Sequence, residues 1–236
     1  FEPTGKESDG KRPLPPEQYY ARLAQRVLSF LTVMTPSGRL YEVDTRLRPN
    51  GRAGSLVSSI SAFGTYQLDQ AWTWELQALT RARFIAGSPA LEAHFNRIRQ
   101  EVLCLDRNEK ELAAELLEMR QRMLKEQAAK LGNRLSGSPK HGPGGLVDIE
   151  FIAQLGVLAN ARLYPRVIRA TGTGQQINEL ASIGWLSGTE TQQLLETMAG
   201  LRNQKLMAAL IRDYPESGAG MQESAAIFHS RLGAEA

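Results

Sequence analysis

The chain has 236 residues, of which 42% are hydrophobic and 22% charged, proportions typical of a globular protein rather than a disordered or fibrous one. Its 28 basic and 25 acidic side chains leave a net charge of only +3, and the dispersed basic residues argue against a nucleic-acid partner. No apolar run approaches the roughly 20 residues that span a bilayer. The single cysteine, Cys104, cannot form a disulfide within the chain, which is typical of proteins in a reducing compartment. We therefore expect a cytoplasmic protein without a membrane partner.

The first half of the chain mixes predicted element types. Residues 1–16 are polar and rich in Pro and Gly, which favours a loop, and apolar residues at helical spacing then predict a helix that begins near Glu17. Residues 39–48 alternate strictly between apolar and charged side chains, which predicts a strand that ends at Pro49. Further helices are predicted to begin after a cap at Ser58 or Ser59, near Trp72 and at Ser88.

The second half is predicted to be helical throughout. Helical periodicity covers residues 109–131, 146–161, 175–183 and 189–211, and a loop rich in Gly, Ser and Pro occupies residues 132–145. A last apolar segment surrounds Ile227. The chain is therefore predicted to be α+β and mostly helical, with one domain at residues 1–104 and a helical bundle domain at residues 105–236.

The predicted strand carries the residues with the clearest chemistry. Four charged side chains alternate along one of its faces: Glu42, Asp44, Arg46 and Arg48. One interpretation is a set of ion pairs on an exposed sheet, each contributing at most about 1 kcal/mol. The other is that Asp44 binds Mg²⁺ or Mn²⁺ while Arg46 and Arg48 contact phosphate oxygens, because carboxylates suit divalent metals and guanidinium groups match phosphate.

Several stretches together resemble one enzyme family. The string YEVDTRLRP at residues 41–49, followed by the glycine-containing loop at 51–57, resembles the glutamine synthetase adenylyltransferase family. The similarity continues through AWTWE at 71–75, QAL at 77–79 and RAR at 81–83, and GGLVDIEFIAQ at 144–154 resembles the start of that family's helical domain. The resemblance extends from about Leu14 to Arg212.

The resemblance implies a function. Members carry two nucleotidyltransferase units, each followed by a helical bundle; one transfers AMP from ATP to a tyrosine of glutamine synthetase, and the other removes it by phosphorolysis. Residues 41–42 and 71–75 look more like the C-terminal, adenylylating unit. The resemblance further implies Asp44 as a catalytic metal ligand and a role near the nucleotide for Arg46, Arg48, Arg81 and Arg83, with Mg²⁺ or Mn²⁺ and ATP bound.

One departure from the family pattern bears on activity. The family's nucleotidyltransferase core begins with an Asp-x-Asp pair on an earlier strand, and no such pair precedes Asp44, which matches the third carboxylate. We therefore expect residues 1–104 to be a partial nucleotidyltransferase domain and this chain alone to be inactive, because a two-metal site that lacks two of its three carboxylates binds Mg²⁺-ATP poorly.

Other features leave alternatives open. The helical half could instead be a regulatory module that binds glutamine synthetase or a PII-type signalling protein, as the resemblance suggests, or the chain could belong to the deadenylylating unit.

Glu75 could lie near the nucleotide or form a surface ion pair. The start of the helix at Gly144 and Gly145 could bind an anion, although Asp148 and Glu150 in its first turn favour capping.

Overall fold

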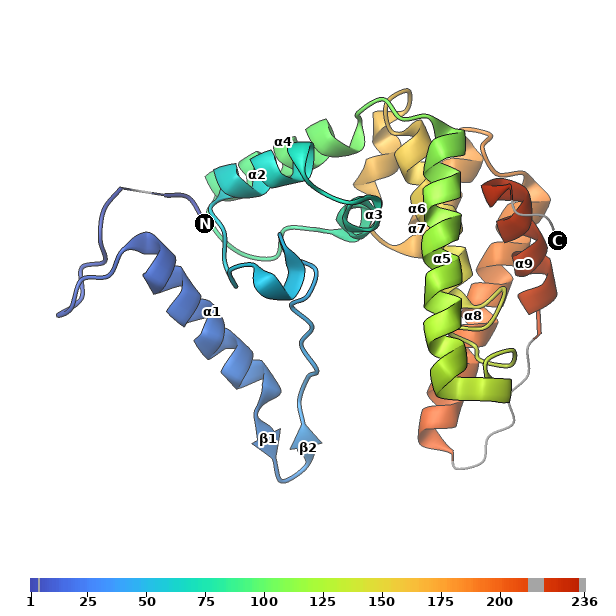
Figure 1. The fold of residues 1–236 in the computed structure, drawn as a ribbon, viewed down its shortest axis with the longest axis horizontal. Coiled ribbons are helices and arrows are strands. Elements are labelled where there is room, and N and C mark those ends of the chain that lie inside the picture. Colours follow the sequence, from blue (N-terminus) through green and yellow to red (C-terminus); the bar gives the residue numbers. More distant parts are fainter. Residues whose placement is uncertain (4, 212–218, 234–236) are drawn as a thin grey trace. The chain divides into compact units, whose positions relative to one another are not determined.

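The computed structural model describes residues 1–3, 5–211 and 219–233, the side chain of Arg52 excepted (Figure 1). Over these residues the chain forms nine α-helices, three short 3-10 helices and a two-stranded sheet, which confirms the α+β, mostly helical class. The α-helices are α1 (Pro16–Thr32), α2 (Ile60–Asp69), α3 (Thr73–Arg81), α4 (Pro89–Leu103), α5 (Glu109–Leu131), α6 (Leu146–Asn160), α7 (Thr173–Ser182), α8 (Gly188–Leu210) and α9 (Met221–Leu232). The strands are β1 (Met34–Thr35) and β2 (Gly38–Arg39), and the 3-10 helices are η1 (Gly51–Ala53), η2 (Gly132–Arg134) and η3 (Pro165–Arg169). None of the described helices combines the length and the apolarity needed to cross a membrane.

Packing divides the chain into two compact units. Unit 1 comprises residues 1–75 and 84–102, and unit 2 comprises residues 76–83 and 103–236. The second part of α3 therefore packs with the later helices, although it precedes α4 in the sequence. The division into a domain at residues 1–104 and another at 105–236 stays a prediction.

Unit 1 is held together by contacts around α2 and α4. Of the two predicted caps, Ser59 is the one that caps α2, by accepting a hydrogen bond from the amide of Ala62 at 3.2 Å. The rings of Phe63 and Phe95 stack with centroids 6.1 Å apart. The N-terminal ammonium group of Phe1 donates a hydrogen bond to the carbonyl of Ser58 at 2.9 Å, which fixes the first residue against the start of α2.

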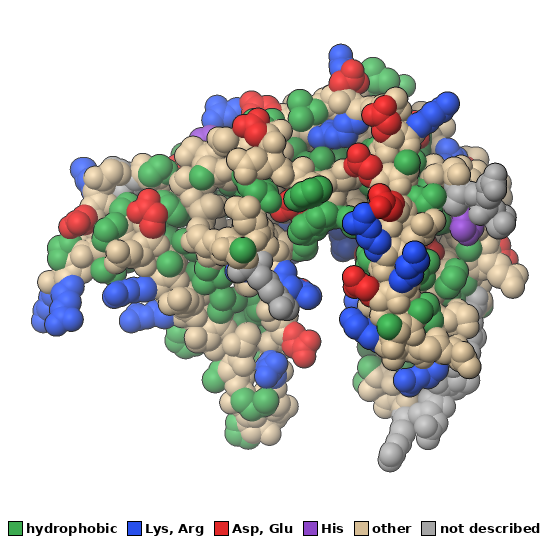
Figure 2. Space-filling view, in the orientation of Figure 1, with side chains coloured by type: hydrophobic (Ala, Val, Ile, Leu, Met, Phe, Trp, Pro, Cys, Tyr) green, Lys and Arg blue, Asp and Glu red, His purple; other side chains and the backbone are tan. Residues whose placement is uncertain are grey.

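The prediction of a strand at residues 39–48 is wrong. Only Met34–Thr35 and Gly38–Arg39 pair, antiparallel, and residues 40–48 form no strand. Alternation of side chains is not sufficient for a strand, since each backbone N–H and C=O also needs a ladder partner. Without a neighbouring strand the apolar side of this segment stays outside a core: Leu40, Tyr41 and Leu47 are all exposed, and Figure 2 shows hydrophobic side chains at the end of the unit that holds β1 and β2.

Helix α6 is the centre of unit 2. Helices α5, α7, α8 and α9 all contact it (Figure 1), so apolar side chains surround the whole helix, as expected of a fully buried one. Gly156 allows close packing there, because a Cβ atom at this position would lie 2.5 Å from Cδ1 of Leu180 and 2.6 Å from Cζ3 of Trp185. The buried apolar residues of α6 are Val147, Ile149, Phe151, Ile152, Ala153, Leu155, Val157 and Leu158.

A buried ion pair joins α5 to the start of α6. Nε of Arg120 pairs with the Asp148 carboxylate, and the two side chains are 1% and 4% exposed. Asp148 also accepts a hydrogen bond from the amide of Gly144 at 2.6 Å. The other end of the Arg120 guanidinium donates to the carbonyl of His141 at 2.9 Å. The pair therefore fixes the loop at residues 132–145 as well as the two helices.

Gly144 brings that loop against α9. Its φ of +73° is in the left-handed region, and a Cβ atom would lie 1.8 Å from the carbonyl oxygen of Met221, so only glycine fits. The hydroxyl of Ser224 donates a hydrogen bond to the Gly144 carbonyl at 2.6 Å. The glycine is thus explained by the close approach of two backbones.

Replacing Asp148 with Ala is expected to destabilise the chain by about 3–5 kcal/mol, because Arg120 would remain buried without its counter-charge. Urea denaturation measures this loss. The control is Glu118→Ala, which breaks an exposed ion pair with Arg122 on α5 and should cost less than about 1 kcal/mol. Equal losses in the two variants would contradict the structural role given to the buried pair.

Glu190 should make stability depend on pH. Its carboxylate closes a capping box with Ser187 and accepts a hydrogen bond from Nη2 of Arg231 at 2.7 Å. Burial alone would raise the pKa of Glu190, but the hydrogen bonds from Arg231 and Ser187 outweigh it and lower that pKa below its ordinary value. The folded state therefore favours the carboxylate, and the stabilisation is present above the unfolded-state pKa and is lost as the pH falls through the folded-state pKa.

We expect Glu190→Gln to lower the thermal unfolding midpoint at pH 7 by a few degrees. In the variant, the midpoint should also fall less steeply as the pH is lowered through the acidic range. Thermal denaturation across that range measures both effects. Glu196→Gln, which alters an exposed carboxylate on the same helix, serves as the control and should leave the profile unchanged.

Candidate functional site

Asp44 and Arg46 form a local ion pair in unit 1. Nε of Arg46 lies 2.9 Å from each carboxylate oxygen of Asp44, and Nη2 also contacts this carboxylate. The amide of Arg46 donates to Oδ1 of Asp44 at 2.8 Å, so the carboxylate also closes a tight turn. Its hydrogen bond and its charge raise the pKa of Arg46 above the ordinary value. Both side chains are exposed, and the second guanidinium edge of Arg46 faces outward from the pair.

Arg48 is held by the loop that follows it. Its Nη1 donates to the carbonyl of Thr45 at 2.5 Å and to the Thr45 hydroxyl at 3.1 Å. Nε and Nη2 reach the carbonyl of Gly54 at 3.4 Å and 3.5 Å. The guanidinium thus braces the turn-rich segment between residues 45 and 54 with hydrogen bonds that replace a strand ladder.

The segment around Asp44 offers an incomplete metal site. Residues 42–46 line an open depression of about 440 Å³. Within the described part of the chain, no three His, Cys, Asp or Glu side chains come together in a way that could hold a metal ion. Asp44 supplies one carboxylate that is already paired with a guanidinium, so these residues do not fit a Mg²⁺ site by themselves.

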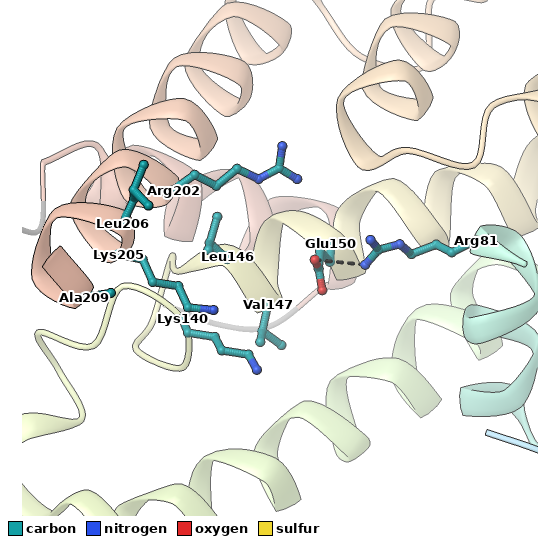
Figure 3. A pocket seen from close by; sticks show the side chains of 9 residues that line it. All are labelled: Arg81, Lys140, Leu146, Val147, Glu150, Arg202, Lys205, Leu206 and Ala209. Carbon is teal, nitrogen blue, oxygen red and sulfur yellow. Dashed lines mark hydrogen bonds and ion pairs between the residues drawn. The ribbon is translucent and has the colours of Figure 1, made fainter. Parts of the chain in front are cut away.

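The other predicted nucleotide contacts lie in unit 2 or near its boundary. Nη1 of Arg81 pairs with Oε1 of Glu150 at 3.0 Å (Figure 3), and Arg83 is exposed just beyond the end of α3. The structure therefore brings Asp44, Arg46 and Arg48 together within one short segment, while Arg81 and Arg83 belong to another unit.

Glu75 neither forms a surface ion pair nor presents a free carboxylate to a ligand. Its carboxylate is buried and accepts hydrogen bonds from the hydroxyl of Tyr66 at 3.0 Å and from the amide of Trp72 at 3.0 Å. Burial, followed by the proximity of Glu75, raises the pKa of Tyr66. Glu75 therefore connects the end of α2 to the start of α3.

The start of α6 is not an anion site. The amides of Leu146 and Val147 already donate to the carbonyls of Pro139 and Lys140, at 3.0 Å and 3.2 Å, and Asp148 occupies the amide of Gly144. The polar residues of the 144–154 motif instead contact different elements: Asp148 binds α5, Glu150 binds Arg81, and Gln154 accepts a hydrogen bond from Gln77 at 2.8 Å. The anion-binding interpretation is thus not supported, and the capping interpretation is not borne out in its simple form, because α6 begins after Gly145 without a side-chain cap and has only Asp148 as an acidic residue in its first turn.

A second cavity gathers cationic residues that the sequence analysis did not single out. It lies in unit 2 and its lining includes Lys140, Arg202 and Lys205 (Figure 3). The spacing of Arg202 and Lys205 by three residues on a helix places them on one face, a signal present in the sequence. Nothing in the sequence indicates that Lys140, from the loop at residues 132–145, joins them.

We expect Arg48→Ala to speed amide hydrogen exchange of residues 50–54 by about tenfold, because hydrogen bonds from a charged donor contribute about 1.5–3 kcal/mol. Hydrogen–deuterium exchange with mass spectrometry measures the change. Arg46→Ala removes a neighbouring guanidinium that makes no contact with Gly54 and should leave these amides unaffected; equal acceleration in both variants would refute the bracing role.

Comparison with known proteins identifies relatives for both parts of the chain. Residues 1–98 match the family model described as glutamate-ammonia ligase adenylyltransferase, and residues 110–213 match that of GlnD PII-uridylyltransferase. A bifunctional glutamine synthetase adenylyltransferase/adenylyl-removing enzyme from Methylococcus capsulatus is 44% identical over 189 residues, or 79% of this chain and 20% of the relative.

Further relatives with the same name give the same result. The protein from Nitrosococcus oceani is 44% identical over 83% of this chain and 20% of its own length, and that from Stenotrophomonas maltophilia is 43% identical over 87% and 22%. The chain spans about a fifth of the length of the curated relatives it matches. At this identity over most of its residues, the chain belongs to the glutamine synthetase adenylyltransferase family.

Proposed function

We propose that this chain is part of an enzyme that transfers AMP from ATP to a tyrosine of glutamine synthetase. The observation that carries this proposal is the 44% identity to enzymes named for adenylylation of glutamine synthetase, together with the match of residues 1–98 to the adenylyltransferase model. The region of that match contains Asp44, Arg46 and Arg48.

The proposed reaction is a displacement at phosphorus. The tyrosine oxygen forms a bond to the α-phosphorus of ATP, the bond from that phosphorus to the bridging oxygen breaks, and pyrophosphate leaves with the bonding electrons. The phenolic proton is lost to a base or to solvent. Because negative charge shifts onto the phosphate oxygens, cationic side chains near them lower the barrier.

The arginines of the 44–48 segment suit different tasks in this scheme. Arg46 uses Nε and Nη2 on Asp44, and a guanidinium has five N–H donors, so its remaining edge is available to a phosphate oxygen. Arg48 directs its hydrogen bonds to Thr45 and Gly54, which favours a bracing role over phosphate contact. Arg81 and Arg83 are the further nucleotide-binding candidates, and Arg81 would exchange its partner Glu150 for phosphate.

Asp44 is the proposed catalytic carboxylate and metal ligand. Magnesium or manganese would supply charge neutralisation at the phosphates, and it would require carboxylates in addition to those that the described residues gather. In this chain Asp44 orients Arg46, and that pairing holds a negative and a positive group where residues 42–46 form an open surface.

Removal of AMP is the second candidate reaction. The relatives are named as both adenylyltransferases and adenylyl-removing enzymes, so the same chemistry run with phosphate as the nucleophile, releasing ADP, is consistent with those names. The match of residues 110–213 to a PII-uridylyltransferase model supports a regulatory contribution of the helical unit, with a PII-type protein as partner. A cytoplasmic location completes this proposal.

We expect Asp44→Asn, made in the intact protein that contains this chain, to reduce AMP transfer by at least about 100-fold. The assay follows label from α-labelled ATP onto glutamine synthetase. Arg122→Gln, which changes an exposed residue of α5, is the control and should transfer at the normal rate. Near-normal transfer by the Asp44→Asn variant would refute the assignment of Asp44.

A companion assay separates the two candidate reactions. Incubation of pre-adenylylated, labelled glutamine synthetase with phosphate measures removal, which yields labelled ADP. Loss of transfer alone in the Asp44→Asn variant supports the adenylylating unit, whereas loss of removal alone moves the assignment to the adenylyl-removing one.

A further inference from the structure

A buried tyrosine and a buried glutamate of unit 1 form a hydrogen-bonded pair that the proposed chemistry does not use. Tyr66 on α2 and Glu75 in the first turn of α3 are 8% and 6% exposed. The Tyr66 hydroxyl lies 3.0 Å from each carboxylate oxygen of Glu75, and the amide of Trp72 donates to Oε2 of Glu75 at 3.0 Å. Because a carboxylate offers only acceptors, the hydroxyl gives its single hydrogen to Glu75. The lone pairs of the Tyr66 oxygen are thus left for another donor.

The backbone of Asn50 supplies that donor. Burial raises the pKa of Tyr66, and a hydrogen bond with the backbone of Asn50 offsets part of this rise. A bond that lowers this pKa stabilises the phenolate, so it is donated by the Asn50 amide, since a bond from the hydroxyl to a carbonyl would act in the opposite direction. The Tyr66 hydroxyl therefore joins the carboxylate at the start of α3 to the loop at residues 50–54.

Asn50 has an unusual backbone conformation. Its φ of 60° and ψ of 17° are in the left-handed region, and within the described ranges it is the only residue other than glycine with a positive φ. Its carbonyl accepts hydrogen bonds from the amides of Ala53 and Gly54 at 3.1 Å and 3.2 Å, so the whole loop is built on this residue. Such conformations persist where surrounding contacts impose them, and the Tyr66 hydroxyl is a contact of this kind.

The loop in turn contacts the segment that carries Asp44. The Gly54 carbonyl accepts from Nε of Arg48 at 3.4 Å, and Nη1 of Arg48 donates to the carbonyl of Thr45, the residue after Asp44. None of residues 40–48 is buried, so their own side chains do not anchor them in a core. A continuous series of hydrogen bonds therefore connects the buried Tyr66 to the exposed segment.

We propose that Tyr66 and Glu75 are positioning residues for the transfer of AMP. The Tyr66 hydroxyl, oriented by Glu75, holds Asn50 in its left-handed conformation. Asn50 thereby fixes the loop that places Asp44 and Arg46. This role rests on the proposed function of the segment at residues 44–48, and it requires neither buried residue to touch the substrate. A small displacement of reacting groups reduces the rate of a reaction by a large factor, so a single buried hydroxyl can affect the transfer step.

Tyr66→Phe, made in the intact protein that contains this chain, tests the role because it keeps the buried ring and removes only the hydroxyl. Hydrogen–deuterium exchange with mass spectrometry should show exchange at residues 50–54 that is faster by about tenfold. We expect kcat for AMP transfer to fall by about tenfold, while KM for ATP changes by less than about twofold. Glu75→Gln keeps an oxygen that can accept the Tyr66 hydrogen bond, so it should show the same pattern to a smaller extent.

The control is Tyr164→Phe, which removes the hydroxyl of an exposed tyrosine in unit 2 and should leave exchange and kcat unchanged. Normal exchange at residues 50–54 in Tyr66→Phe, or a normal kcat despite faster exchange there, would show that the hydroxyl only supports the packing of α2 and α3 and would overturn the role. Absence of transfer by the unmodified intact protein would refute the proposed function itself, and this role with it. Circular dichroism establishes that the variants fold.

Discussion

The buried pair between Arg120 and Asp148 is the constraint on which the helical unit depends. A charge that is removed from water costs several kcal/mol unless its partner and hydrogen bonds are in place, so α5, α6 and the intervening loop must assemble together. Asp148 fixes the amide of Gly144, and Gly144 then meets the backbone of α9. The same loop carries Lys140 to the cationic cavity. One ion pair thus links α5, the start of α6 and the loop that contributes Lys140 to the cavity.

Order arises differently in the segment that carries Asp44. Residues 40–48 have no ladder partner, and their apolar side chains are exposed, so neither sheet hydrogen bonds nor a core defines their conformation. Side-chain hydrogen bonds take over this role: Asp44 closes a turn on Arg46, and Arg48 holds the carbonyls of Thr45 and Gly54. Charged residues of the proposed catalytic segment are therefore also its local structural supports, which couples its shape to the same groups that the chemistry uses.

The sequence predicts those features that depend on near neighbours. Helix starts at Ser59 and at Pro89, and the long helices of unit 2, follow from caps and from 3.6-residue periodicity. The strand at residues 39–48 fails because a strand requires a distant partner that the alternating pattern does not reveal. The burial of Glu75 and the partners of Asp148 and Glu150 also depend on tertiary contacts. In the same way, Lys140 lines the same cavity as Arg202 only because of how the loop at residues 132–145 folds, which no spacing rule encodes.

We propose that the described residues contribute the catalytic segment around Asp44 but not a complete catalytic site. In the described part of the chain, Asp44 belongs to no group of three or more side chains that could hold a metal ion, whereas metal-assisted transfer of a nucleotidyl group requires a fuller set of ligands. The most direct measurement compares transfer of label from α-labelled ATP to glutamine synthetase by this chain and by the intact protein that contains it. We expect transfer by the intact protein alone. Transfer by the chain on its own, at a comparable rate, would contradict it.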